Sequence, residues 1–140
     1  MKIKESVYRR VLNEIPCVPP ESGGVLGGTD DIISVYCFDM GIKSGEMFYW
    51  PDVKFLNAVL RDWHYQGIQF YGIFHSHIEG GDALSEADMR YAMRILSSLP
   101  DKNGSLLFPV VIPRKQVLFY RGKVVDNKLM ISEEIVTCIK

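Results

Sequence analysis

The sequence predicts an α/β fold of the α+β type, in which helices flank a mixed or largely antiparallel sheet. Segments with apolar residues at helical spacing alternate with segments rich in β-branched and aromatic residues. With 140 residues, of which 47% are hydrophobic, the chain is long enough to bury an apolar core without disulfides or metal staples. Residues 1–140 are therefore expected to form a single domain.

The first third of the chain predicts one helix and two strands. Between Glu5 and Ile15 apolar residues recur at helical spacing, and three nearby prolines prevent the helix from continuing. The glycine-rich segment from Glu21 to Gly28 is expected to pair as a strand that lets other backbone approach closely. From Ile32 to Phe38 a second strand is expected, because the segment is rich in β-branched and aromatic residues.

Two further helices enclose a strand and a loop. Pro51 and Asp52 are expected to open a helix that Gly67 closes, with Pro51 in its first turn. The segment from Ile68 to His75 reads as a hydrophobic strand, and residues 78–84 form a glycine-containing loop. Ser85 is a good N-cap for a third helix, which ends before Pro100.

The last third predicts short strands. They are expected over Leu106–Ile112, Gln116–Tyr120, Val124–Val125 and Leu129–Val136. Turn residues separate them, at Pro113–Lys115 and at Asp126–Asn127. The pattern contains no repeat and no linker.

Charge and composition lead us to expect neither nucleic-acid binding nor membrane association. Sixteen basic residues face seventeen acidic ones, so no global field favours nucleic acid or an anionic membrane. No apolar run approaches the roughly 20 residues that span a bilayer, and Met1–Glu5 lacks a signal-peptide core. The three cysteines lack C-x-x-C spacing, which favours reduced thiols. We therefore expect a cytoplasmic protein, and the sequence leaves open whether it forms a homodimer.

One segment carries metal-binding chemistry. If the strand continues through His77, the side chains of His75 and His77 project from the same face and reach one cation. Asp88, in the first turn of the third helix, then offers a third ligand. Three protein ligands with an open fourth position are typical of catalytic zinc. His-x-His alone is more often a structural pair, and Ser85 with Asp88 also forms a capping box, which is compatible with catalysis.

The spacing of these residues resembles the JAMM metallopeptidases, also called the MPN-plus or Mov34 family. Their signature is His-x-His, seven residues, then Ser-x-x-Asp, and here His75, His77, Ser85 and Asp88 match it. Gly72-Ile73-Phe74 resembles the lead-in, and Glu21 before a glycine-rich run resembles the glutamate-bearing strand. The resemblance covers roughly Glu21 to Ala92 and implies a JAB/MPN domain of cytidine deaminase-like architecture, in a compact prokaryotic-type member.

The resemblance also implies roles. His75, His77 and Asp88 would bind Zn²⁺, and Glu21 would act as general base and then as general acid. Ser85 would donate a hydrogen bond to the oxyanion, while Ser76, on the opposite strand face, would support the site. The implied activity is hydrolysis of a peptide or isopeptide bond in a protein or peptide substrate, such as the C-terminal tail of a ubiquitin-like or sulfur-carrier protein.

Several alternatives remain open at this stage. Glu14, Glu79 and Glu86 compete with Glu21 for the role of base, although their positions are typical of solvated surface. A proline commonly follows the second histidine in the family, whereas this chain has Ile78, and the tryptophan found before the serine in many eukaryotic members is absent. These departures concern the substrate rather than the ligands. A non-catalytic MPN-type binding module and a RadC-like protein are the alternative functions.

Overall fold

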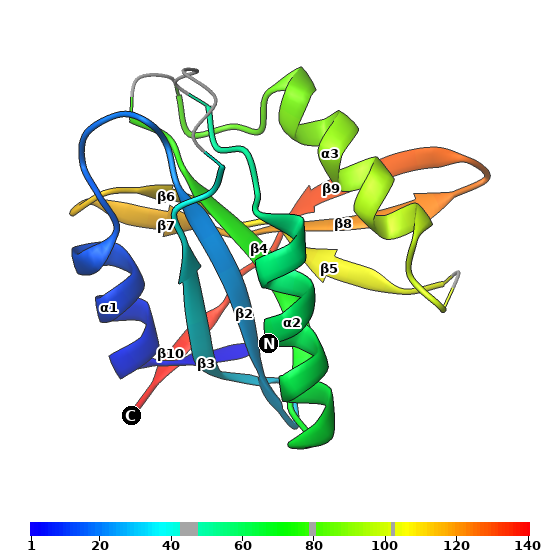
Figure 1. Cartoon of the computed structure of the whole chain (residues 1–140), viewed down its shortest axis with the longest axis horizontal. Helices are drawn as coiled ribbons and strands as arrows, with labels where there is room; N and C mark the ends of the chain where they lie inside the picture. Colours follow the sequence, from blue (N-terminus) through cyan, green and yellow to red (C-terminus); the bar gives the residue numbers. More distant parts are fainter. Residues whose placement is uncertain (43–47, 79–80, 102) are drawn as a thin grey trace.

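The computed structural model describes residues 1–42, 48–78, 81–101 and 103–140 (Figure 1). Its helices are α1 (Glu5–Glu14), α2 (Val53–Tyr65) and α3 (Glu86–Ser97). Its strands are β1 (Lys2–Lys4), β2 (Gly23–Thr29), β3 (Ile32–Asp39), β4 (Gln69–Ser76), β5 (Ser105–Leu107), β6 (Val110–Ile112), β7 (Gln116–Leu118), β8 (Tyr120–Val125), β9 (Lys128–Glu133) and β10 (Thr137–Ile139). The predicted fold class is confirmed, because these strands form one curled mixed sheet flanked by helices.

The strands are hydrogen-bonded in the order β10-β1-β3-β2-β4-β5-β8-β9, and β6 pairs with both β4 and β7. The central strands β3, β2 and β4 are antiparallel, whereas β4 runs parallel to β5 and β6. A two-residue loop joins β2 to β3, with φ values of 54° at Asp30 and 60° at Asp31. These positive angles are typical of the type I′ hairpin turn. The site-bearing strand β4 therefore lies at the centre of the sheet.

The predicted close approach at the glycine-rich strand is confirmed. A Cβ atom on Gly27 would lie 2.7 Å from the ring of Trp63 and 2.7 Å from the carbonyl oxygen of Gln69. A Cβ on Gly24 would collide with the backbone carbonyl of Cys37. Glycine thus lets α2 and both neighbouring strands pack directly against β2.

Two apolar clusters lie on opposite faces of the sheet, because strand residues alternate between the faces. Leu26 and Phe74 point toward α1, which contributes Val7 and Val11. Their strand neighbours point the other way, toward α2 and α3; this second cluster contains Val25, Leu56, Trp63, Ile73, Ala92, Leu96, Leu106 and Phe108. The central strands are therefore enclosed between helices on both faces.

The observed start of α2 differs from the prediction. Asp52 is its N-cap, and the Asp52 Oδ1 accepts a hydrogen bond of 3.1 Å from the amide of Phe55. Pro51 therefore precedes the helix instead of lying in its first turn. The predicted end is confirmed, since Gly67 follows the C-cap with φ of +76°.

The C-terminal strands differ from the prediction in their boundaries. The expected strand Leu106–Ile112 is two strands, because the chain leaves β5 at Phe108 and Pro109 and then continues as β6 along another part of β4. The expected strand Leu129–Val136 ends at Glu133, and β10 then pairs with β1 in parallel. β1 was not predicted, since three residues are too short to show a period of two. Within the described part of the chain, no helix has the length and apolarity to cross a membrane.

Candidate metal centre

The two histidines lie where β4 ends. β4 stops at Ser76, one residue earlier than a strand through His77 would, but the backbone stays extended beside β6. The His75 amide donates to the Pro109 carbonyl at 3.2 Å, and the His77 amide donates to the Val111 carbonyl at 3.0 Å. The two side chains therefore share one face, and their Nε2 atoms are 2.8 Å apart. The predicted alignment of the pair is confirmed.

Asp88 reaches the histidines from the first turn of α3. Its Oδ2 lies 3.2 Å from Nε2 of His75 and 3.1 Å from Nε2 of His77. The same oxygen accepts a hydrogen bond of 2.9 Å from the Ser85 amide, and Ser85 Oγ accepts one of 3.1 Å from the Asp88 amide. This capping box fixes the carboxylate before any ligand binds. The Asp88 side chain thus takes part in the cap of α3 and also faces both histidines.

The orientation of His77 shows that lone pairs converge at this point. Its Nδ1 lies 2.9 Å from the carbonyl oxygen of Gly81, which can only accept a hydrogen bond. Nδ1–H therefore donates to this carbonyl, so Nε2 presents a lone pair in the neutral ring, whereas in the protonated ring Nε2–H donates to Asp88. That lone pair faces Nε2 of His75 and a carboxylate oxygen of Asp88. Facing lone pairs repel unless a proton or a metal ion lies between them.

The size of the cluster suits a metal ion. The three facing atoms form a triangle with sides of 2.8, 3.1 and 3.2 Å. Tetrahedral ligands at the usual zinc distances of about 2.0–2.1 Å stand about 3.3 Å apart. Among the described residues, His75, His77 and Asp88 form a group of potential metal ligands, and their ligand atoms all lie within 4.8 Å of one another. The residues present therefore fit a metal ion.

The electrostatics of the cluster also favour a cation. Burial by itself would raise the pKa of the Asp88 carboxyl, but hydrogen bonds from His75 and His77 hold it well below its ordinary value. The hydrogen bond to Asp88 raises the pKa of His77, against the opposing effect of burial. Asp88 is therefore an anion at neutral pH, held between two imidazoles.

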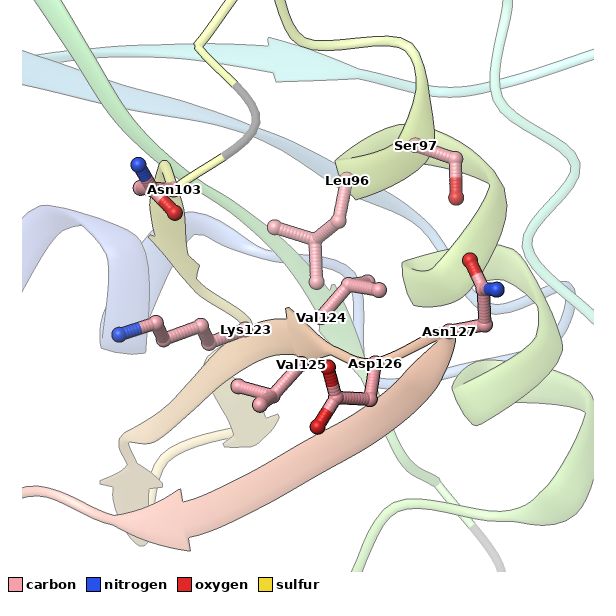
Figure 2. A pocket seen from close by; sticks show the side chains of 8 residues that line it. All are labelled: Leu96, Ser97, Asn103, Lys123, Val124, Val125, Asp126 and Asn127. Atoms are coloured by element: carbon pink, nitrogen blue, oxygen red, sulfur yellow. The ribbon is translucent and has the colours of Figure 1, made fainter.

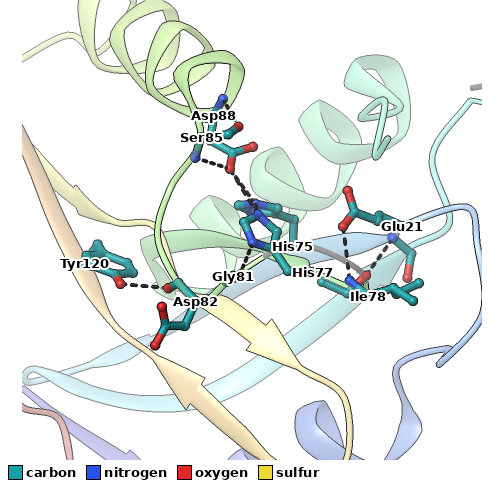
Figure 3. A network of polar contacts seen from close by, with 11 residues as sticks. Glu21, His75, His77, Ile78, Gly81, Asp82, Ser85, Asp88 and Tyr120 are labelled. Atoms are coloured by element: carbon teal, nitrogen blue, oxygen red, sulfur yellow. Dashed lines mark hydrogen bonds and ion pairs between the residues drawn. The ribbon is translucent and has the colours of Figure 1, made fainter. Parts of the chain in front are cut away.

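Glu21 lies on the other side of the histidine pair (Figure 3). The prediction placed it on a strand, but β2 begins at Gly23, so Glu21 precedes the strand. Its Oε2 accepts a hydrogen bond of 3.2 Å from the amide of Ile78, the residue after His77. The carboxylate also contributes to the raised pKa of His77, after the larger effect of Asp88. The predicted base thus lies beside the second histidine.

Ser76 holds the segment that carries Glu21 through two hydrogen bonds to Ser22. Its amide donates to the Ser22 carbonyl at 2.8 Å, and the Ser22 amide donates to Ser76 Oγ at 3.1 Å. Both serines are buried. Since Ser22 follows Glu21 directly, the two bonds fix the backbone of Glu21 relative to the histidines. The expected supporting role of Ser76 therefore has a structural basis.

The competing glutamates lie elsewhere or outside the described residues. Glu14 is exposed on α1 and forms an ion pair of 3.1 Å with Arg10. Glu86 is exposed in the first turn of α3. Glu79 lies outside the described residues. Ser85 is exposed and accepts the capping bond, which leaves its own hydroxyl proton available for donation.

Two contacts of the loop before α3 were not predicted. The Gly81 carbonyl orients His77, and the Tyr120 hydroxyl donates to the Asp82 carbonyl at 2.7 Å. Backbone carbonyls carry no sequence signal, and Tyr120 is 38 residues from Asp82. Only the fold brings them together.

A separate hollow lies at the other end of α3 (Figure 2). The residues that line it are Leu96, Ser97, Asn103, Lys123, Val124, Val125, Asp126 and Asn127. None of the predicted site residues is among them. This hollow is therefore distinct from the candidate metal centre.

No family model matches the sequence, and no curated protein matches it. Solved structures do match, among them a protein of Desulfitobacterium hafniense with a TM-score of 0.66 and 18% identity over 99% of this chain and 92% of that one. A JAB1/MPN domain protein of Archaeoglobus fulgidus gives 0.56 and 16% over 100% and 97%. A protein of Salinibacter ruber gives 0.60 and 14% over 99% and 92%. At these identities the likeness concerns the fold, which is therefore MPN-like.

Proposed function

We propose that this protein is a zinc-dependent hydrolase of peptide or isopeptide bonds, with His75, His77 and Asp88 as ligands and Glu21 as general base. The observation that carries the proposal is the triangle of two imidazole nitrogens and one carboxylate oxygen with a second carboxylate beside it. A zinc ion bound there supplies Lewis acidity that polarises a carbonyl and favours the ionisation of water. The MPN-like fold supports the same proposal.

Glu21 would move the proton. Its Oε2 is held by the Ile78 amide, and a carboxylate has further acceptor sites with which to take a proton from an attacking water. As the water oxygen bonds to the carbonyl carbon, Glu21 takes one proton, and it delivers that proton to the nitrogen when the carbon–nitrogen bond breaks. The products are a carboxylic acid and an amine, so atoms and charge balance.

Ser85 would act as the oxyanion donor. The Asp88 amide binds to its oxygen, and this bond fixes the side chain at the start of α3. The hydroxyl proton is then free to stabilise the negative charge that develops on the carbonyl oxygen. In other enzymes, loss of one such donor slows turnover by about 10²–10³. Glu21 and Ser85 would thus act on different atoms of the same substrate bond.

The substrate is proposed to be the C-terminal tail of a ubiquitin-like or sulfur-carrier protein. This part rests on the family resemblance alone. A panel of such proteins fused at the C-terminus to a reporter, together with a peptide library, would test it.

Zinc content and turnover of three variants test the central claim. The purified protein should hold zinc near one equivalent. His77→Ala should lose both zinc and hydrolysis, and Glu21→Gln should keep zinc but lose turnover by roughly 10²–10⁴. His64→Ala is a matched control, because His64 is exposed at the end of α2. A native protein that binds no zinc would end the proposal.

The result for Glu21→Gln also separates the enzyme from a binding module. If the native protein binds zinc but neither it nor the variant hydrolyses any member of the panel, the non-catalytic MPN-type module becomes the better description. If only the native protein turns over substrate, the module is excluded.

A further inference from the structure

Gly81, in the described part of the loop before α3, contacts the candidate metal site but has little packing of its own. Gly81 and Asp82 are both exposed, and a Cβ atom built on Gly81 would meet no described atom within 4 Å. Yet the Gly81 carbonyl lies 2.9 Å from Nδ1 of His77 and determines which nitrogen of the neutral ring carries the proton. A contact that fixes a ligand therefore depends on an exposed segment.

Tyr120 is the buried side chain that reaches this segment. It is the first residue of β8 and only 8% exposed. Its backbone is fixed twice, because its carbonyl accepts from the Phe108 amide at 2.7 Å and it pairs with Glu133 of β9. Its hydroxyl donates to the Asp82 carbonyl at 2.7 Å (Figure 3). The sheet thereby holds the loop at one point.

The two carbonyls are mechanically connected. Gly81 and Asp82 are consecutive, and the peptide unit between them is planar. Only the φ and ψ angles of Asp82 separate the Gly81 carbonyl from the Asp82 carbonyl. A hydrogen bond that holds the second therefore restricts the orientation of the first.

We propose that Tyr120 is a positioning residue for the metal site, which acts through the Asp82 and Gly81 carbonyls to hold His77 with its proton on Nδ1 and its lone pair toward the metal. This inference rests on the proposed metal site. Tyr120 touches neither the metal ligands nor the reacting atoms. Its effect is expected on zinc affinity and on the histidine tautomer.

Zinc affinity of Tyr120→Phe provides the first test. Loss of a direct partner of a metal-binding histidine typically weakens metal binding by about 10–100-fold, and Tyr120 is one step further away. We therefore expect zinc to bind roughly three- to tenfold more weakly in a competition titration with a chromophoric chelator. The ring is retained, so the packing of β8 should persist.

Tyr71→Phe is the matched control. Tyr71 is also buried, and its hydroxyl accepts from the Asp31 amide at 3.0 Å and donates to Gln69 Oε1 at 2.7 Å, at the opposite end of β4. This variant loses a buried hydroxyl remote from the site. It should lose stability without a change in zinc affinity. If both variants weaken zinc equally, the effect is general destabilisation and the inference is wrong.

The tautomer of His77 gives a second readout that needs neither activity nor zinc. Nitrogen-15 shifts of the imidazole, measured on metal-free protein at a pH where the ring is neutral, should show the proton on Nδ1 in the native protein. In Tyr120→Phe the Nε2–H form should become populated. A native His77 with its proton on Nε2 would overturn the inference, even if the variant proved impossible to purify.

The outcomes separate this inference from the proposed function. If the native protein binds no zinc, both fail. If the native protein binds zinc and Tyr120→Phe matches it in affinity and tautomer, only the role of Tyr120 fails.

Discussion

The two ends of α3 differ in what they offer a ligand. At its amino end, an ordinary capping box directs Asp88 toward two imidazoles, and three atoms able to bind a cation lie within 3.2 Å of each other. At its carboxyl end, roughly 14 Å further along the helix axis, lies the hollow beside the β8–β9 turn. One cation, Lys123, and one anion, Asp126, line it beside polar and apolar side chains. Convergence of potential metal ligands, and not concavity, thus distinguishes the candidate metal centre from the hollow.

The substitution Asp88→Ala should have the largest effect, because it alters the amino end of α3. It removes one of three ligands, so zinc affinity should fall by at least about 100-fold. It also removes the side chain that accepts from the Ser85 amide, so stability should fall by about 0.5–1 kcal/mol. Zinc titration and thermal unfolding measure the two effects.

Glu86→Ala is the control for that variant. Glu86 is an acid in the same helical turn but is exposed. It should lose a few tenths of a kcal/mol from the helix dipole and no zinc affinity. Equal zinc affinity in Asp88→Ala and the native protein would show that the amino end holds no metal.

A substitution at the carboxyl end should affect stability alone. Asn127 borders the hollow and has φ of 62°, in the left-handed region that a side chain without a local polar group disfavours. Asn127→Ala should therefore cost about 1 kcal/mol in urea unfolding, and Asn127→Gly should be less harmful. Both should bind zinc as the native protein does. Weaker zinc binding or hydrolysis in either variant would mean that the hollow takes part in function.

The smallest expected effect concerns the ion pair between Arg121 of β8 and Glu134. Arg121 donates to both carboxylate oxygens of Glu134, at 2.9 and 2.7 Å. This hydrogen bond is the main reason that the pKa of Glu134 lies below its ordinary value of 4.5, although burial opposes the shift. The carboxyl is partly exposed, so Glu134→Gln should cost no more than about 1 kcal/mol at neutral pH.

The pH dependence of that variant has a definite sign. A depressed pKa in the folded state stabilises the protein above the pKa of the unfolded state, and this contribution disappears as pH falls through the folded value. The difference in unfolding free energy between native protein and Glu134→Gln should thus be constant above about pH 5 and shrink below about pH 4. A difference that grows on acidification would contradict the assignment of the ion pair.

The local pattern of the sequence was sufficient for the elements that build the site. A period of two places His75 and His77 on one face, and Ser85 followed by Asp88 predicts both a helix start and a carboxylate in its first turn. Both predictions hold, because each depends on backbone geometry within a few residues. Glu21 was assigned by resemblance, and the structure places it beside His77 through the Ile78 amide.

The elements that the sequence did not reveal depend on partners far along the chain. The division at Phe108 and Pro109 arises because β4 offers two separate stretches of edge, and β1 exists because β3 and β10 flank it. Aromatic residues that cluster before a helix usually lie in the core, yet Phe48 and Trp50 are 61% and 53% exposed.

What the sequence determined by itself was the set of candidate ligands, two imidazoles and one carboxylate, and the local element on which each one lies. Only the tertiary structure decided that these donors meet, because the seven-residue loop leaves the position of α3 relative to β4 open until their apolar faces pack. The same is true of the Tyr120 hydroxyl and the Asp82 carbonyl, which come from distant segments. Short-range spacing follows from backbone geometry, whereas long-range convergence requires the packed sheet.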